Sequence, residues 1–217
     1  MKIVFQNQYF IALDKAPGQL AVPARSSEDP RPVLGLLLEQ HLGKSIFPVH
    51  RLDAEVSGLI LYALDKDSHR EANRVFEERR VQKTYQAFSK GGDFAEAASG
   101  TWKAQILRGK KRAFESPVGK SAITDYEIKK KYGSIYEWRL RPKTGRSHQL
   151  RWELYRHESP IIGDDLYGSN ETWSFGGIAL RSLSLKFEEE FTNRWALPEH
   201  LLVEPWLLSP DQGLSQY

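Results

Sequence analysis

The stretch from Gly58 to Leu64, GLILYAL, restricts the fold more than any other part of the chain. It contains no charged residue, and Asp53, Ser57 and Asp65 lie just outside it. A continuous apolar run of this length, bounded by polar residues, is typical of a buried strand. We therefore expect a strand here with little or no exposure to water.

Other segments show the periodicity of strands and helices. Residues 135–141 alternate apolar and charged side chains, which is typical of a half-buried strand. Residues 68–80 place apolar residues at helical spacing, and Asp67 is the expected cap. We also expect a mobile loop at 24–31 and irregular coil over the C-terminal 25 residues. The remaining expected strands are 3–13, 83–88, 102–107, 122–130 and 176–187, and the remaining expected helices are 33–41 and 146–155.

The order of these segments favours one fold class. Strands outnumber helices, and the two are interspersed without strict alternation. This favours an α+β fold around a mixed or antiparallel sheet. A chain of 217 residues suits one large domain or two small ones, and we expect a single domain over residues 1–217.

The composition excludes several kinds of protein. The absence of cysteine rules out a disulfide framework, an iron–sulfur cluster, a thiolate zinc site and a cysteine nucleophile. Mean hydropathy is −0.53, and no apolar stretch approaches the roughly 18 residues of a membrane span. The residues after Met1 lack the apolar core of a secretory signal, so we expect a cytosolic protein without membrane attachment.

Charge is distributed unevenly along the chain. Residues 102–156 hold 15 Lys and Arg against five Asp and Glu, whereas residues 157–217 hold three against ten. A basic segment of this size attracts polyanions and predicts salt-dependent binding, although a solvated charged surface is the alternative. Interleaved aromatic residues are typical of a surface that stacks bases. The candidate RNA contacts are Lys110, Lys111, Arg112, Lys129, Lys130 and Lys131.

Four motifs contain residue types that serve chemistry. An Asp in a loop before a rigid strand can be held in place, and a glycine turn before an arginine-rich helix favours anions. Taken singly, each motif also has a structural interpretation, such as a turn cap, a packed tyrosine, a hydrogen-bonded histidine or a tight loop. No His, Asp and Glu set has the spacing of a metal site, so we expect no metal. The motifs are HRLD ending at Asp53, Lys83-Thr84-Tyr85, TGRSHQLR ending at Arg151, and GDDLYG ending at Gly168.

Taken in order, these motifs resemble the RluA family of RNA pseudouridine synthases. GKSAITDYE lies between the second and third motifs, and the opening LDKAPGQLAVP and closing GIALRSLSLKF are also similar to the family. The resemblance covers most of the chain, from residue 10 to residue 190. It implies the pseudouridine synthase fold, with flanking helices, a central catalytic cleft and no cofactor. It also implies that the protein converts uridine in RNA to pseudouridine.

The resemblance also implies roles for single residues. Asp53 matches the essential catalytic aspartate, Tyr85 the tyrosine against the uracil, and Arg151 the basic partner of the aspartate. Arg51 matches the arginine that displaces the target nucleotide from its stack, and Leu150 lines the uracil pocket. The partner expected is a stem-loop of rRNA or tRNA, bound by a monomer. Further substrate contacts expected from the same motifs are His50, Arg146 and His148.

The chemistry requires an ionised Asp53, and a neighbouring Arg151 favours that form. The carboxylate can stabilise or bond to the glycosidic carbon, or it can remove a proton from C2′. The sequence leaves both routes open. We expect the pair of Asp53 and Arg151 to be the core of the site.

The chain departs from the family pattern at a few positions. HRLDAEVSG stands where the family has HRLDKxTSG, TGRSH replaces TGRTH, and Arg181-Ser182 interrupts the usual LHA. None of these changes removes a catalytic position, and the choice of substrate stays open. The pattern starts close to Met1, so we expect no S4 domain in front and assign RNA binding to the basic surface.

Two other functions compete with this interpretation. A non-catalytic RNA-binding or RNA-chaperone module on the same fold would explain the basic segment equally well, but it would leave uridine unchanged. A phosphate-ester hydrolase at the Thr144–Arg151 turn would need a metal, or a nucleophile beside a base, and the sequence shows neither.

Overall fold

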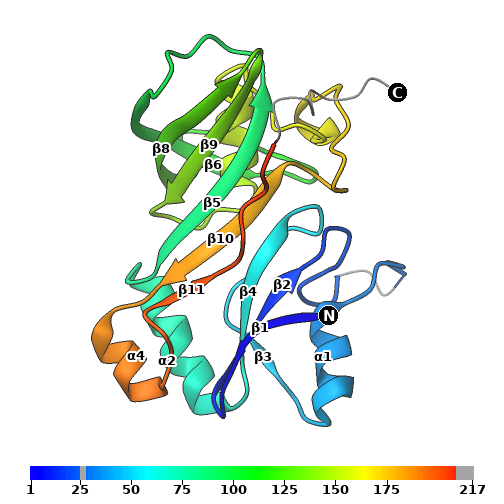
Figure 1. Ribbon diagram of the computed structural model, residues 1–217, viewed down its shortest axis with the longest axis vertical. Helices are drawn as coiled ribbons and strands as arrows, with labels where there is room; N and C mark the ends of the chain where they lie inside the picture. The colour runs from blue at the N-terminus through cyan, green and yellow to red at the C-terminus, as the bar shows by residue number, and fades with distance from the viewer. Residues whose placement is uncertain (25–27, 209–217) are drawn as a thin grey trace. The chain divides into compact units, whose positions relative to one another are not determined.

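The computed structural model describes residues 1–24 and 28–208, which form two compact units (Figure 1). Unit 1 contains residues 1–83 and 182–203, and unit 2 contains residues 84–181 and the described residues from 204 onward. The expected loop at 24–31 includes residues 25–27, which lie outside the described residues.

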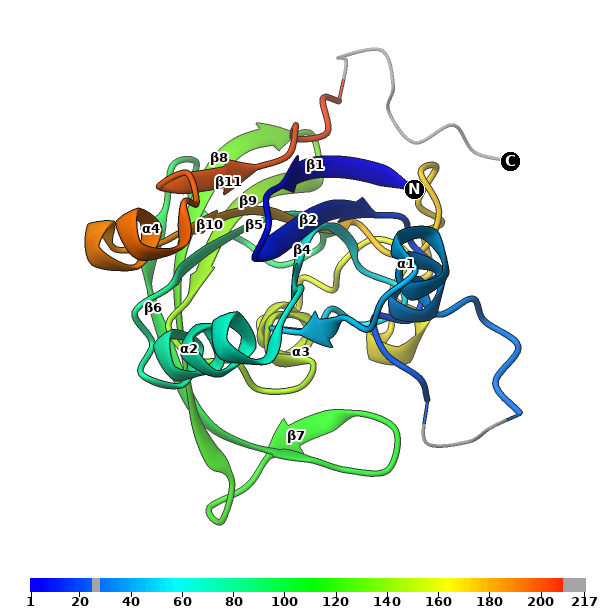
Figure 2. The same ribbon diagram turned by 90° about the horizontal axis from the view of Figure 1, so that it is seen from below.

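Unit 1 is built on a sheet with the strand order β1-β2-β4-β10, and β1, β2 and β4 lie side by side (Figure 2). β3 pairs with β4, and β11 pairs with β10. The strands are β1 (Lys2–Gln6), β2 (Phe10–Lys15), β3 (Phe47–Pro48), β4 (Ser57–Ala63), β10 (Leu180–Lys186) and β11 (His200–Leu202), and the helices are α1 (Leu34–Leu42), α2 (Lys66–Glu77) and α4 (Glu189–Trp195).

The apolar run in the sequence is confirmed as a buried strand. Every residue of β4 is buried, and its neighbour β2 is almost as fully enclosed. Gly58 in β4 has a φ of +104°, and a Cβ there would lie 2.2 Å from the backbone oxygen of Ser182. Only glycine permits this close approach of two backbones.

The extended segment predicted at 3–13 is two strands with a turn between them. The Asn7 side chain accepts hydrogen bonds from the backbone N–H groups of Tyr9 and Phe10, both at 2.8 Å. An asparagine that bonds its own backbone in this way is a turn-forming residue. β1 and β2 then pair antiparallel.

The ends of two predicted helices are only partly as expected. α1 (Leu34–Leu42) ends one residue beyond the predicted helix at 33–41, and Gly43 in the left-handed conformation caps it. The cap predicted for α2 is wrong, because Asp65 and not Asp67 accepts the first backbone N–H groups. The helix therefore begins at Lys66, before the predicted start.

The C-terminal part is more ordered than predicted. β11 and the last three residues of α4 lie within the C-terminal 25 residues, where irregular coil was expected, and α4 itself was not predicted. β10 is shorter than the predicted strand at 176–187. Phe191 and Trp195 of α4 belong to the core of unit 1, together with Phe10 and Leu185. This burial stabilises a helix too short to form alone.

Unit 2 contains an antiparallel sheet with the strand order β5-β9-β8-β6-β7. The alternation predicted for residues 135–141 is confirmed, since Tyr136, Trp138 and Leu140 are buried. The prediction missed the short β7. The strands are β5 (Gln82–Lys90), β6 (Ser99–Arg108), β7 (Ala113–Glu115), β8 (Lys120–Tyr132) and β9 (Ile135–Pro142), followed by α3 (Gln149–Arg156) and the 3₁₀ helix η1 (Asp165–Tyr167).

Candidate active site

The HRLD motif forms the loop between β3 and β4 in unit 1. Leu52 is buried, Asp53 is half-buried and Arg51 is exposed. The carbonyl of Asp53 accepts a hydrogen bond from the N–H of Val56 at 3.1 Å, which closes a tight turn. The loop therefore keeps its apolar residue in the core and leaves the two polar residues accessible.

His50 holds the start of this loop. Its Nε2 accepts a hydrogen bond from the backbone N–H of Leu61 at 3.1 Å, and its ring stacks on Phe76 with centroids 5.2 Å apart. Burial, with a smaller effect from the charge of Lys83, lowers the pKa of His50 to about 3. The imidazole is therefore neutral at physiological pH, and one ring nitrogen is already occupied by the protein's own backbone.

Lys15 anchors the other side of the loop and was not singled out from the sequence. Its buried ammonium donates hydrogen bonds to the carbonyl oxygens of Ala16, Gln19 and Ala54 at 2.8–3.0 Å. Burial lowers the pKa of Lys15 to about 8. Because Ala54 directly follows Asp53, this lysine fixes the backbone next to the carboxylate. The sequence feature that could have identified Lys15 is its place at the end of a largely apolar strand, where a charged side chain needs polar partners.

Tyr85 comes from β5 in unit 2. It is half-buried and pairs in register with Leu140 of β9. A tyrosine in such a position has one part of its side chain packed and another part accessible.

The TGRSHQLR motif uses its polar residues to build a turn and then a helix. The Thr144 hydroxyl accepts the N–H of Ile123 at 2.9 Å and donates to Oε1 of Gln149 at 2.7 Å. The same Oε1 accepts the backbone N–H of Arg146 at 3.0 Å. This network lets α3 begin at Gln149, three residues after the predicted start. His148 precedes it in the left-handed region, with φ +56°.

Arg151 lies in the first turn of α3 and is buried. Its Nε and Nη2 donate to Oδ2 and Oδ1 of Asp164, each at 2.7 Å. The side chains are only 4% and 1% exposed, so this is a desolvated bidentate ion pair. Asp164 belongs to the GDDLYG motif, for which we favoured a structural role. No pattern in the sequence indicated separately that Asp164 would contact Arg151.

The other predicted contacts in this motif also have partners in unit 2. Arg146 donates its Nε to the carbonyl of Ser121 at 2.9 Å. His148 Nδ1 forms a 3.1 Å hydrogen bond with the Tyr167 hydroxyl, and Leu150 is 6% exposed. His148 thus forms a hydrogen bond of the kind expected of a structural histidine, and its contact with substrate stays a prediction.

Residues 9–156 match a protein family described as RNA pseudouridylate synthase. The chain belongs to this family. The match includes both the HRLD loop and the whole TGRSHQLR motif, which confirms the resemblance read from the sequence. As a member of this family, the protein is an isomerase that acts on uridine in RNA.

Individual relatives agree with this assignment. The chain is 32% identical over 203 residues to the dual-specificity RNA pseudouridine synthase RluA of Pasteurella multocida, covering 90% of each chain. It is 26% identical to tRNA pseudouridine synthase C of Vibrio parahaemolyticus, covering 95% of this chain and 92% of that one. The structure of human RNA pseudouridylate synthase domain containing 4 matches with a TM-score of 0.72 at 21% identity, over 94% of this chain and 88% of that chain. This likeness confirms the expected α+β fold.

In this pseudouridine synthase, the predicted RNA contacts form two clusters. The first cluster (Lys110, Lys111, Arg112) lies in the loop between β6 and β7, and the second (Lys129, Lys130, Lys131) lies near the end of β8. The first cluster lies beyond Ile106, which pairs with Lys120 at the start of β8. Lys129 lies nine residues further along β8, roughly 30 Å away at the usual rise per residue. One nucleotide therefore cannot contact both clusters.

The two clusters also differ in their partners. Lys110 and Lys111 form no ion pair within the described parts of the chain, and both are exposed. Lys129 pairs with Glu127 at 2.7 Å. Lys130 and Lys131 lie over the rings of Tyr132 and Tyr136. The first cluster is therefore the better candidate for contact with phosphates.

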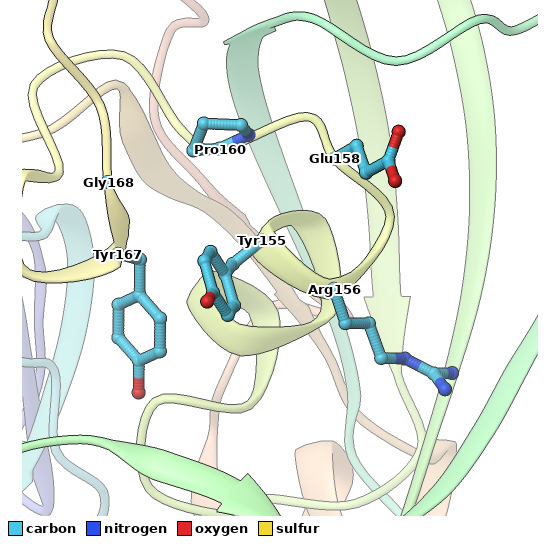
Figure 3. Close-up of a pocket in the computed structure, with 6 residues that line it drawn as sticks. All are labelled: Tyr155, Arg156, Glu158, Pro160, Tyr167 and Gly168. Atoms are coloured by element: carbon cyan, nitrogen blue, oxygen red, sulfur yellow. The ribbon is translucent and has the colours of Figure 1, made fainter.

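An open pocket of about 370 Å³ lies at the C-terminal end of α3 (Figure 3). Tyr155 and Tyr167 lie side by side in it, with ring centroids 5.8 Å apart. The Arg112 guanidinium lies 5.7 Å from the centroid of the Tyr155 ring, which connects the first basic cluster to this helix. The remaining lining residues are Arg156, Glu158, Pro160 and Gly168.

The three residues predicted as catalytic belong to different units. Asp53 lies in unit 1, whereas Tyr85 and Arg151 lie in unit 2. Their close approach stays a prediction.

Within residues 1–24 and 28–208, the helices are all too short or too polar to span a membrane.

Proposed function

We propose that Asp53, Tyr85 and Arg151 form the active site of this pseudouridine synthase. The observation that supports it most is the buried ion pair that holds Arg151, since a buried arginine with a fixed plane presents its charge in one direction. The half-buried Asp53, between anchors at His50 and Lys15, is the corresponding fixed acid. We propose that the whole chain acts as one catalytic domain with a central cleft.

The reaction breaks the N1–C1′ bond of uridine, rotates the uracil and joins C5 to C1′. A stacked base cannot rotate, so the nucleotide must first leave its stack. We propose that the exposed Arg51 takes part in this displacement and that Tyr85 offers a ring face to the uracil. Leu150 supplies an apolar wall to the same pocket.

Asp53 then acts on the ribose. The C1′ carbon becomes electron-poor as its bond to N1 breaks, and a carboxylate stabilises or bonds to such a carbon. Removal of the C2′ proton is the second route. Both routes need the ionised acid.

We propose a stem-loop of tRNA or rRNA as the substrate. The names of the relatives support this class, since one is a tRNA pseudouridine synthase and another is a dual-specificity RNA pseudouridine synthase. Binding uses the two basic clusters. We further propose that the protein is a monomer in the cytosol, where these RNAs occur. The family match favours this enzyme over an RNA chaperone that leaves uridine unchanged.

Replacement of Asp53 tests the proposed site. Asp53→Asn keeps the shape of the side chain but removes its charge, so we expect pseudouridine formation to fall at least 1,000-fold with RNA affinity within threefold of wild type. Carbodiimide mapping of tRNA and rRNA incubated with the purified protein measures the product and its position.

The matched control is Asp67→Asn, an exposed carboxylate on α2. It should leave the rate unchanged. Near-normal activity of Asp53→Asn would contradict the proposed mechanism. Absence of product from the wild-type protein on every RNA tested would favour the chaperone.

A further inference from the structure

The GDDLYG motif encloses the guanidinium of Arg151 in unit 2. Asp164 accepts two hydrogen bonds from it, and the ring of Tyr167 lies 5.4 Å from its central carbon. Both contacts come from residues three apart in one short turn. The motif therefore contributes more than a tight loop.

The bidentate pair determines the plane of the guanidinium. Asp164 engages Nε and Nη2, and a guanidinium is rigid and planar, so these two contacts also fix where Nη1 lies. Arg151 and Asp164 are both buried, and an arginine left buried without its acid is strongly destabilised. The orientation of the Arg151 guanidinium thus depends on the Asp164 carboxylate.

Asp164 is itself held in place by the backbone of the motif. Its N–H donates to the carbonyl of Ile161 at 3.0 Å, and its carbonyl accepts from the N–H groups of Tyr167 and Ser169. Gly163 before it has a φ of +85°, and a Cβ there would lie 2.7 Å from the backbone oxygen of Gly177. Glycine at this position lets the turn bring Asp164 beneath α3.

The hydroxyl of Tyr167 is held by two hydrogen bonds. Its hydroxyl accepts the backbone N–H of Ala113 at 2.7 Å and bonds to Nδ1 of His148 at 3.1 Å. The side chain is completely buried, and burial raises the pKa of its phenol, which therefore stays neutral. Its ring gives Arg151 a rigid face to pack on.

We propose that Asp164 is a positioning residue for the isomerisation, acting through Arg151, and that Tyr167 supports the same guanidinium. This inference rests on the proposed role of Arg151. Asp164 does not contact substrate. Its effect is on the rate of the chemical step, because a small displacement of a group at the reacting centre slows catalysis far more than it weakens binding.

Two substitutions test the proposal. Asp164→Asn removes the charge, and Asp164→Glu keeps the charge but moves it by one methylene, of the order of 1 Å. We expect the single-turnover rate at saturating enzyme to fall about 100-fold for Asp164→Asn and at least tenfold for Asp164→Glu. RNA affinity should stay within threefold for both. Asp165→Asn, at the exposed neighbouring carboxylate, is the matched control and should keep the wild-type rate.

The outcomes distinguish a positioning role of Asp164 from a purely structural one. They also distinguish a failure of this inference from a failure of the proposed active site. A wild-type rate in Asp164→Glu would overturn it, and so would a loss of RNA affinity in parallel with the rate. If Asp164→Asn does not fold, Asp164→Glu still decides the question, because it preserves the ion pair. A wild-type rate in Arg151→Met would instead refute the proposed role of Arg151.

Discussion

At the scale of single residues, some polar side chains of the motifs build local backbone structure, and others form a pair in the protein interior. Thr144 and Gln149 bond to each other and to the backbone, and they build the turn before α3. Arg151 and Asp164 pair in the interior. The sequence located the motifs, but it did not separate the residues that hold the chain from those that face the substrate. The role of each polar residue depends on its contacts in the fold. One such contact joins Arg151 and Asp164, which are thirteen residues apart in the sequence.

His50 predicts a dependence of stability on pH. Its pKa is about 3 in the folded protein, against an ordinary value of 6.5. Between these values the unfolded chain binds more protons than the folded one, so stability falls as the pH decreases from about 6.5 toward 3. Above that window the stabilisation is fully present. The slope from this one group reaches about 1.4 kcal/mol per pH unit.

Urea unfolding of His50→Asn between pH 4 and pH 8 measures this contribution. We expect a shallower loss of unfolding free energy on acidification than in wild type. His41→Asn, at an exposed position of α1, should leave the slope unchanged. Equal slopes for His50→Asn and wild type would show that the imidazole is not held in its neutral form.

At the scale of helices and strands, local patterns predicted the elements better than their ends. The buried run at β4 and the alternation in β9 follow from local periodicity, and both are confirmed. The start of α2 was misplaced because two aspartates stand two residues apart and either could cap a helix. The start of α3 was misplaced because its turn is held by Ile123, which is distant in sequence.

The cap of α2 gives a prediction for this scale. The Asp65 carboxylate accepts the N–H groups of Asp67 and Ser68, both at 2.9 Å, and also bonds the Ser68 hydroxyl. We expect Asp65→Ala to lower the free energy of unfolding by about 1–2 kcal/mol in urea titrations. Asp67→Ala should change it by less than about 0.5 kcal/mol. A larger loss of unfolding free energy in Asp67→Ala than in Asp65→Ala would show that Asp67 is the cap, as the sequence predicted.

At the scale of the whole molecule, the order of the motifs was informative where individual patterns were not. HRLD, K-x-Y and TGRSHQLR indicated the family, and the match over residues 9–156 confirms it. The strand order was not predictable, since β5 pairs with β9, whose sequence lies some fifty residues away. The division into two units, with Asp53 in one and Arg151 in the other, was equally absent from local patterns.

A crystal structure of the protein bound to an RNA stem-loop tests the central claim most directly. The quantity to measure is the distance from the carboxylate of Asp53 to the guanidinium of Arg151. We predict a separation of about 4–6 Å, with the ring of Tyr85 against the target uracil. A separation well beyond that range, or a Tyr85 ring remote from the base, would contradict the account.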